Sequence, residues 1–270
     1  MITTMCAVTA LVVSYFSGPM LNFGDFSRYG RSFRAVRVGN FWGLPVNFVL
    51  FSLLTVLTAA ATIPVYGRLI TDPVETVGQI DSTFALVLAA LTFTTATIGI
   101  NIVANFVSPA FDFSNVSPQK ISWQAGGMIA AVGSVLLTPW SLYKSPETIH
   151  YTLDTLGAFI GPLFGVLIAR FYLVHKQRIA VDQLFTMDPA GTYFYPKGYN
   201  PSAIYATAIA AVFSLSSVFV PGVKAADDYS WFIGCGVALV AYVLIATRMG
   251  VTNTEKLDAA PGLVVTGEGN

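Results

Sequence analysis

Four polar residues recur along one face of a long apolar stretch, between positions 91 and 112 of the chain. They are Thr97, Asn101, Asn105 and Ser108, whose spacings of four, four and three residues align them along a helix. An amide in hydrocarbon is costly unless it is hydrogen-bonded, so the two asparagines must face protein, water or a ligand. We interpret this polar stripe as the wall of a substrate path in a transporter. The alternative is that the stripe joins helices by side-chain hydrogen bonds.

The composition is that of an integral membrane protein. Of the 270 residues, 54% are hydrophobic and 10% are charged, whereas a soluble domain carries about 25% charged residues. The formal net charge is zero, which gives no indication of a nucleic-acid partner. Two histidines and two isolated cysteines, Cys6 and Cys235, argue against a metal centre. An enzyme is the least favoured class, because no nucleophile elbow or pair of intramembrane carboxylates is visible.

Apolar segments long enough to span a bilayer, which needs roughly 20 residues each, predict an all-α membrane protein. The transmembrane region is expected over residues 1–247, and a polar, disordered cytoplasmic tail over residues 248–270. The seven segments are Thr3–Asn22, Leu44–Tyr66, Thr83–Ala110, Ile121–Trp140, Leu153–Val174, Ala203–Val220 and Trp231–Thr247.

Basic residues predict the orientation of these segments. The loops on one side hold eleven Lys and Arg residues and the loops on the other side hold three. The positive-inside rule places the richer side in the cytoplasm, so the C-terminus is cytoplasmic and Met1 lies outside. An odd number of spans with an outside N-terminus fits a chain that lacks its front portion. The richer set is Arg28, Arg31, Arg34, Arg37, Lys120, Arg170, Lys176, Arg178, Lys197, Arg248 and Lys256, and the poorer set is Arg68, Lys144 and Lys224.

Two segments contain a Gly-Pro pair. Gly18-Pro19 is expected to interrupt the first segment near its middle, because proline removes a backbone donor and glycine lowers helix propensity. Broken membrane helices persist where the freed backbone groups line a cavity. A simple kink packed against a neighbouring helix is the alternative. Gly161-Pro162 likewise marks either a bending gate helix or a kinked packing helix.

The connector after the first segment, FGDFSRYGRSFRAVRVGN, repeats arginine every three residues with aromatic and aliphatic residues between. This pattern predicts an amphipathic element on the cytoplasmic surface, where anionic lipid attracts it. Asp25 is expected either to cap its helix or to pair with Arg28.

Four stretches of the chain resemble a known family. LNFGDFSRYGRSF, DPVETV, ATIGINIVANFVSPAFDFSNVSPQKISW and LGAFIGPLFGVLIARFYLV resemble the nucleobase:cation symporters, which include cytosine, uracil, allantoin and hydantoin permeases. The bacterial allantoin and uracil permeases are the most similar branch. The resemblance implies a leucine-transporter-type fold of twelve helices, with two inverted five-helix repeats followed by two extra helices. This chain resembles helices six to twelve, which are the second repeat and the extra helices.

The resemblance also implies which residues bind substrate. Phe16 takes the position of the aromatic residue that stacks on the planar base, and the backbone of Tyr15 contacts the substrate. Asn105 hydrogen-bonds the amide edge of the substrate and Asn101 supports it. An asparagine offers both a donor and an acceptor, which match an –NH–CO– edge, while an aromatic face covers the ring.

The coupling ion stays open between proton and sodium. Sodium-coupled members supply hydroxyls from the two positions before the first asparagine, where this chain has glycine and isoleucine. The backbone carbonyl of Ala96 and the hydroxyl of Thr97 remain as cation ligands, whereas a hard cation wants several oxygens. The proton is therefore favoured. Its carrier is expected in the missing half or at Asp112, because no carboxylate is expected at mid-membrane in this half.

These observations predict a cation symporter in the plasma or inner membrane. Its substrate would be a nucleobase or related ureide such as allantoin, uracil, cytosine or hydantoin, moved by alternating access without a cofactor. The first repeat, absent here, would form the other side of the site. Two alternatives stay open: a truncated fragment that does not transport, and an assembly or sensor protein that uses the stripe only for packing.

Overall fold

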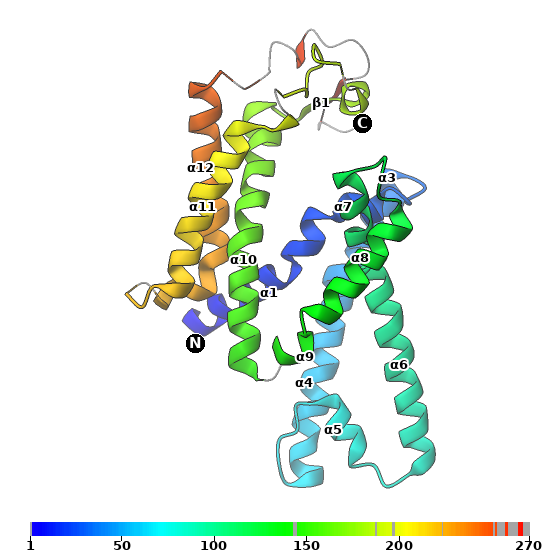
Figure 1. Cartoon of the computed structure of the whole chain (residues 1–270). Helices are drawn as coiled ribbons and strands as arrows, with labels where there is room; N and C mark the ends of the chain where they lie inside the picture. The colour runs from blue at the N-terminus through cyan, green and yellow to red at the C-terminus, as the bar shows by residue number, and fades with distance from the viewer. Residues whose placement is uncertain are drawn as a thin grey trace. The chain divides into compact units, whose positions relative to one another are not determined.

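The structure is a computed structural model that describes residues 2–142, 145–186, 188–195, 198–222, 224–250, 252, 257–258 and 264–266. Lys144, Lys197 and Lys256 of the basic-residue count lie outside the described residues, as does most of the predicted tail. The described part is almost entirely helical (Figure 1). It divides into two compact units, one made of residues 1–21 and 138–270 and the other of residues 22–137.

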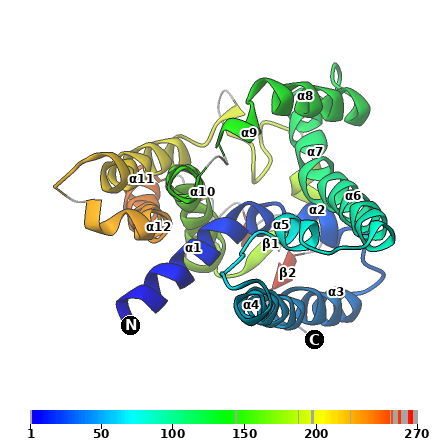
Figure 2. The same cartoon turned by 90° about the horizontal axis from the view of Figure 1, so that it is seen from below.

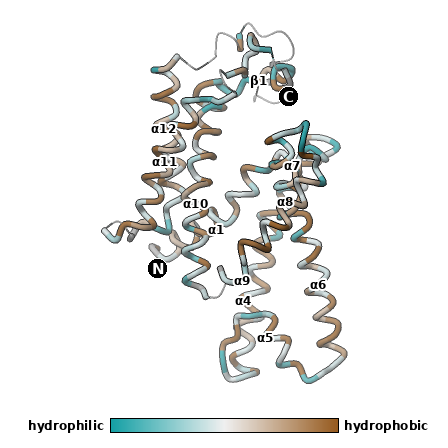
Figure 3. The backbone as a smooth tube through the Cα atoms, viewed as in Figure 1, coloured by the Kyte–Doolittle hydropathy of each residue, from teal (hydrophilic) through white to brown (hydrophobic). Residues whose placement is uncertain are grey.

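Six helices in the described residues are long and apolar enough to cross a membrane. Figure 3 shows their brown, apolar character and the teal, hydrophilic residues that gather in loops and at helix ends. These candidate spans are Thr4–Leu21, Phe33–Tyr66, Thr83–Val116, Glu147–Val174, Pro201–Phe219 and Ala226–Arg248.

One expected span has no counterpart among these six. It is Ile121–Trp140, which is divided between two shorter helices. Helix α8 (Trp123–Leu136) has 14 residues, and the short helix α9 (Pro139–Leu142) follows it. Between them Thr138 has a φ of +46°. Proline disfavours helical backbone at the residue before it and has no N–H to donate, so Pro139 accounts for the interruption.

The unit of residues 22–137 contains two of the long spans. Helix α3 (Phe33–Phe41), a π-helical turn η1 (Trp42–Val46) and helix α4 (Asn47–Tyr66) form one continuous helix that ends at Gly67, which has a φ of +71°. Helices α6 (Thr83–Asn105) and α7 (Val107–Val116) form the other, broken at Phe106. The remaining helices are α2 (Phe23–Ser27) and α5 (Pro73–Gly78), besides α8.

In this unit side-chain hydroxyl or carboxylate groups cap the N-termini of α3, α5, α6 and α8. Ser82 accepts a hydrogen bond from the backbone N–H of Ala85 at the start of α6, and Ser122 accepts one from Ala125 at the start of α8. These caps satisfy backbone donors that have no partner within the helix. Asp25 forms an ion pair with Arg28 at 2.7 Å, which was one of the two roles expected for its carboxylate.

The other unit is a helical bundle. Helices α10 (Pro146–Ile168), α11 (Pro201–Phe219) and α12 (Ser230–Arg248) lie side by side, and α1 (Ile2–Leu21) packs against α10 (Figures 1 and 2). Small residues allow the close approach of α10 to its neighbours, because a Cβ at Gly161 would lie 2.3 Å from the backbone oxygen of Trp231. The buried cluster between these helices is Ala169, Ala206, Tyr242 and Ala246.

A polar cap follows α10 in the same unit. A π-helical turn η2 (Ala169–Val174) leads to strand β1 (Arg178–Ala180) and the 3-10 turn η3 (Val181–Phe185). Strand β2 (Val264–Thr266) comes from the predicted tail and pairs antiparallel with β1, with Ile179 opposite Val265. The sequence analysis did not anticipate this ordered strand. Another 3-10 turn, η5 (Lys224–Tyr229), precedes α12.

The first segment differs from its expected form. Helix α1 continues through Gly18 and Pro19, and the chain leaves the helix only at Asn22, before α2. Pro19 lies two residues from the end of α1, so its missing N–H costs the helix only the bond to the carbonyl of Tyr15. The expected interruption near the middle of the segment is therefore absent from α1.

Candidate functional site

The two asparagines of the polar stripe are joined by a hydrogen bond. Nδ2 of Asn105 donates to Oδ1 of Asn101 at 2.7 Å, and Nδ2 of Asn101 donates to the backbone oxygen of Thr97 at 2.8 Å. The three residues therefore share one face of α6, as their spacing predicts. All three are exposed within their unit. Asn105 has its second N–H and its own Oδ1 left over for a ligand.

The stripe changes character where α6 meets α7. Pro109 has no N–H to donate to the carbonyl of Asn105, four residues earlier, and the helix breaks at Phe106. Beyond the break Ser108 is 2% exposed, and its Oγ has no partner among the described residues. Asp112 is exposed and accepts a hydrogen bond of 3.5 Å from Asn22. The exposed part of the stripe thus ends at Asn105.

The predicted aromatic contacts lie on α1, in the other unit. The rings of Tyr15 and Phe16 meet edge to face, with centroids 5.2 Å apart. Tyr15 is 63% exposed and Phe16 is half-buried. Pro19 has no N–H for the Tyr15 carbonyl. In both units a proline therefore releases the backbone carbonyl of a predicted substrate-binding residue.

The predicted cation ligands are parts of a regular helix. Ala96 and Thr97 are exposed on α6, ten residues or fewer before its end at Asn105. The backbone oxygen of Thr97 already accepts the hydrogen bond from Asn101.

The Gly-Pro pair of α10 is tightly packed. A Cβ at Gly161 would meet the backbone of Trp231, and one at Gly165 would lie 2.3 Å from the backbone oxygen of Cys235. Pro162 is fully buried, and a Cβ at Gly234 of α12 would lie 2.6 Å from its Cδ. Gly18, by contrast, has no atom within 4 Å of an added Cβ. These contacts match the packing alternative for Gly161-Pro162.

Sequence reasoning missed one charged residue inside a span. Asp154 lies on α10 within the span Glu147–Val174 and is 4% exposed. Its Oδ1 has no hydrogen-bond partner among the described residues. Asp154 stands at the edge of the apolar run, where an exposed position is equally consistent with the pattern, so no buried carboxylate was expected there.

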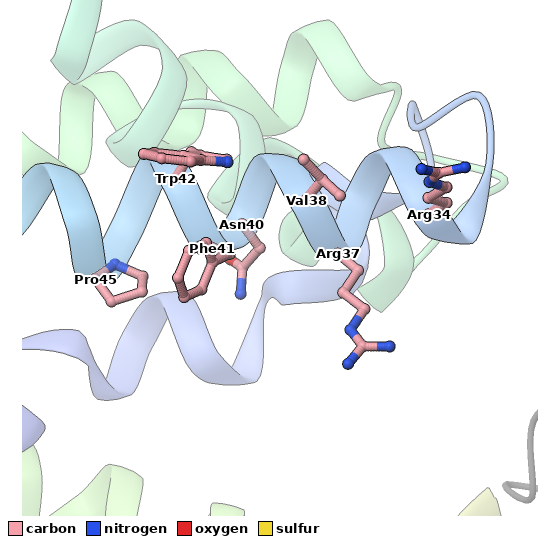
Figure 4. A pocket seen from close by; sticks show the side chains of 7 residues that line it. All are labelled: Arg34, Arg37, Val38, Asn40, Phe41, Trp42 and Pro45. Carbon is pink, nitrogen blue, oxygen red and sulfur yellow. The ribbon is translucent and has the colours of Figure 1, made fainter.

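An open groove on α3 and η1 is lined by two arginines of the predicted amphipathic connector and by two aromatic residues that follow it. Its volume is about 680 Å³. Figure 4 shows that its side chains come from successive turns of one helix, with the Arg37 guanidinium extending away from the ribbon. The lining residues are Arg34, Arg37, Val38, Asn40, Phe41, Trp42 and Pro45. Guanidinium groups beside an exposed Trp are suited to the headgroup region of a bilayer.

Six long apolar helices in the described chain, one of which carries an exposed amide pair, are typical of a multi-pass membrane protein. The sequence profile described as "Permease for cytosine/purines, uracil, thiamine, allantoin" matches residues 2–234. The chain belongs to this family. The resemblance seen in the sequence is thereby confirmed, and the family is one of permeases rather than enzymes.

Characterised and putative permeases from bacteria and plants are similar to the chain. The allantoin permease of Bacillus subtilis (strain 168) is 32% identical over 87% of this chain and 47% of its own length. The putative allantoin permease of Escherichia coli (strain K12) is 31% identical over 91% of this chain and 50% of its own length. The purine-uracil permease NCS1 of Arabidopsis thaliana is 31% identical over 88% and 41%. The chain thus spans about half the length of these relatives.

The fold also has a counterpart among solved structures. The structure titled "Inward facing conformation of Mhp1" matches 74% of this chain and 42% of that chain, with a TM-score of 0.56 and 23% identity. This likeness confirms the all-α membrane fold of the leucine-transporter type that the resemblance implied.

Proposed function

We propose that this chain carries part of the substrate site of a cation symporter for nucleobases or related ureides. Allantoin, uracil, cytosine and hydantoin share a planar ring with an –NH–CO– edge. The observation that carries the proposal is the hydrogen-bonded pair Asn101–Asn105, exposed on a helix of membrane-spanning length. A buried or lipid-facing amide is costly when unpaired, so an exposed pair on such a helix needs a polar partner.

In this proposal Asn105 hydrogen-bonds the ligand, and Asn101 orients the Asn105 side chain. The hydrogen bond to Asn101 uses one N–H of Asn105 and restricts the rotation of its side chain. The remaining N–H and Oδ1 form a donor and acceptor pair that matches the amide edge of the ring. The carbonyl of Asn105, released by Pro109, adds a further acceptor beside them.

Phe16 and Tyr15 are proposed as the aromatic contacts of the ligand. An aromatic face covers a planar ring by stacking, and the released carbonyl of Tyr15 is an acceptor for a ring N–H. Gly18 and Pro19 are proposed as the flexible point of α1, because nothing lies within 4 Å of an added Cβ at Gly18. Gly161 and Pro162 would then belong to a helix that moves with its packed neighbours.

Transport is proposed to occur by alternating access. The movement of the substrate is proposed to be coupled to that of a cation. A proton is favoured over sodium, because Ala96 and Thr97 supply few oxygens for a hard cation and Thr97 is engaged by Asn101. The C-terminus is proposed to be cytoplasmic and the N-terminus outside, on the distribution of basic residues. Transport is also proposed to need the helices that the longer relatives have in addition.

The first experiment is uptake of labelled allantoin and uracil by cells that express the chain, with membrane insertion confirmed. The chain is tested alone and together with the part of the B. subtilis allantoin permease that it does not match. We expect saturable uptake only in the second case, and its loss in Asn105→Ala. Uptake by the chain alone would contradict the need for further helices. Uptake that Asn105→Ala leaves unchanged would contradict the assignment of the site.

A packing role for the stripe predicts a different result. If Asn101 and Asn105 only joined helices, Asn105→Ala would lower the amount of inserted protein and its thermal stability. Binding per folded molecule would then be unchanged. Measuring insertion, thermal unfolding and binding on the same preparation separates the two functions.

A further inference from the structure

Asp154 is a buried carboxylate in a membrane-spanning helix. Its side chain is on the third turn of α10, is 4% exposed and has an Oδ1 without a hydrogen-bond partner among the described residues. Burying an ionised carboxylate without a partner is far more costly than burying its neutral acid form. An ionisable residue inside a membrane span therefore marks a functional site unless a partner neutralises it.

Three elements of the same unit pack around Asp154. Ser230 at the start of α12 donates a hydrogen bond of 3.0 Å to the backbone oxygen of Asp154. Ser14 of α1 reaches the next turn of α10, because a Cβ at Gly157 would lie 3.1 Å from its Oγ. The turn η5 contacts α1, α10 and α12. Asp154 is thus enclosed by elements distant in sequence.

The titratable surroundings of Asp154 are two carboxylates and one imidazole. The titratable groups that interact with it are the carboxylates of Asp227 and Asp228 on η5 and the imidazole of His150 on α10. Both carboxylates are half-buried and His150 is exposed. α1 and α12 face this region with the hydroxyls of Ser14 and Ser230. In the part of the chain that the structure describes, Asp154 forms no ion pair with Lys or Arg.

The hydroxyl of Ser14 is a second buried polar group, and it suits a site whose carboxyl group gains and loses a proton. Ser14 is 5% exposed, and its Oγ has no partner in the described chain. A hydroxyl can donate to an ionised carboxylate or accept from a protonated one. The two oxygens without a partner in the described part of this site are Oγ of Ser14 on α1 and Oδ1 of Asp154 on α10, and Ser14 packs one turn away from Asp154, against Gly157. This arrangement suits a carboxyl group that alternates between a neutral and an ionised form.

We propose that Asp154 is the proton-binding group of this permease and that α1 links it to the substrate. This inference rests on the proposed function. A proton from water on one side adds to a carboxylate oxygen and is later released to water on the other side, with no other bond changed. Ser14 directly precedes Tyr15 and Phe16, the proposed ligand contacts. A change in the packing of α1 against α10 would therefore shift those two residues.

A proton explains the site better than a metal ion. Among the described residues, no three His, Cys, Asp or Glu side chains converge in a way that could hold a metal. A hard cation such as sodium wants several oxygens at once, whereas a proton needs one carboxylate.

The first test does not depend on transport. The whole chain is purified in lipid nanodiscs, and the infrared C=O band of protonated carboxylic acids is followed as the pH is changed. The chain has 14 Asp and Glu residues, so the spectra are compared as differences between each variant and the unaltered chain. We expect one titrating component of the band to be lost in Asp154→Asn and kept in Asp81→Asn, which alters an exposed carboxylate in a loop. The same loss in both variants, or a loss in neither, would overturn the proposal. A band that responds to sodium chloride but not to pH would overturn it in favour of sodium.

A conservative variant covers the case in which Asp154→Asn does not insert. Asp154→Glu keeps an acid but moves it by one methylene, so its band should titrate at a different pH. An unchanged titration in Asp154→Glu would show that the band belongs to another residue and would overturn the proposal.

The second test measures the link to substrate. Binding of allantoin and uracil is measured across the titration range in nanodiscs that hold the chain together with the part of the B. subtilis allantoin permease that it does not match. One linked proton changes the affinity by up to roughly tenfold per pH unit, and Asp154→Asn should bind with an affinity independent of pH. Equal pH dependence in the variant would overturn the coupling. If no variant bound either compound, the proposed function would fail, while the infrared test would still decide whether Asp154 binds a proton.

Discussion

Nδ2 of Asn105 donates a hydrogen bond of 2.7 Å to Oδ1 of Asn101, one turn earlier on α6. This bond orders a side chain that is otherwise exposed within its unit. Asn101 is itself tied to the backbone oxygen of Thr97. The pair is thus built from a single helix, and its geometry does not depend on contacts between distant parts of the chain.

Removing Asn101 should weaken binding without weakening the fold. In Asn101→Ala, Asn105 loses the bond that orients it, and we expect affinity for allantoin or uracil to fall by about tenfold, or roughly 1.4 kcal/mol. Both asparagines are exposed, so the free energy of unfolding should change by less than about 1 kcal/mol. Binding titrations and thermal unfolding check this. Thr92→Ala, which removes an exposed side chain of the same helix, is the control; an equal loss of affinity there would contradict the prediction.

Replacing Pro109 should repair the helix and impair the site. The new N–H of Pro109→Ala can donate to the carbonyl of Asn105, which would straighten the break at Phe106. We expect slower hydrogen exchange in residues 105–110 and weaker ligand binding, because an acceptor is withdrawn. Hydrogen exchange and binding are measured on the same protein. Slower exchange with undiminished affinity would show that the released carbonyl has no part in binding.

A methyl group at Gly161 should destabilise the bundle of α10 and α12. The added Cβ would lie 2.3 Å from the backbone oxygen of Trp231, and overpacking of this kind costs roughly 1–3 kcal/mol. Gly236→Ala is the matched control on α12, because nothing lies within 4 Å of its added Cβ. Thermal unfolding in detergent compares the two. Equal melting temperatures for both variants would mean that α10 and α12 do not pack this closely.

The pairing of the tail strand should weaken in acid. The pKa of His175 lies below its ordinary value, because burial and then the charge of Arg170 disfavour its protonated form, against a smaller opposite effect of the Thr252 carbonyl. As the pH falls through the ordinary histidine pKa of 6.5, His175 gains a proton when the tail is detached but not when the tail is docked, with β2 paired to β1. The docked tail is therefore fully stable above this pH and loses stability below it.

Hydrogen exchange of the backbone of Val264–Thr266 measures this docking directly. We expect faster exchange, corrected for its intrinsic pH dependence, as the medium is acidified, and no such change in His175→Gln. His150→Gln, which alters an exposed histidine of the same unit, should behave like the unaltered chain. An acid effect that persists in His175→Gln would assign the change to another group.

The parts predictable from sequence are those that local spacing determines. Asn101 and Asn105 are four residues apart, so any helix brings them together, and six apolar runs have the length of a span. The break within the run Ile121–Trp140 was not predicted, because its hydropathy continues through Thr138 and Pro139, where the backbone leaves the helix. The interruption expected at Gly18-Pro19 was misplaced because a proline near a helix end costs only one hydrogen bond.

Asp154 could not be recognised in the same way. It is buried where α1, α12 and η5, which lie far from it in sequence, pack against α10. A single aspartate at the end of an apolar run is compatible with either water or a protein interior. Likewise, the pairing of β1 with β2 joins residues more than eighty positions apart, and three-residue strands leave little periodicity to detect.

The shortness of α8 has a consequence for the surrounding lipid. Its 14 residues rise by only about 21 Å, whereas the hydrocarbon layer is about 30 Å thick. α8 could therefore cross the bilayer by itself only where the bilayer thins locally, at a cost of a fraction of a kcal/mol for each ångström. The interruption at Thr138 and Pro139 thus limits the thickness of hydrocarbon that α8 can match.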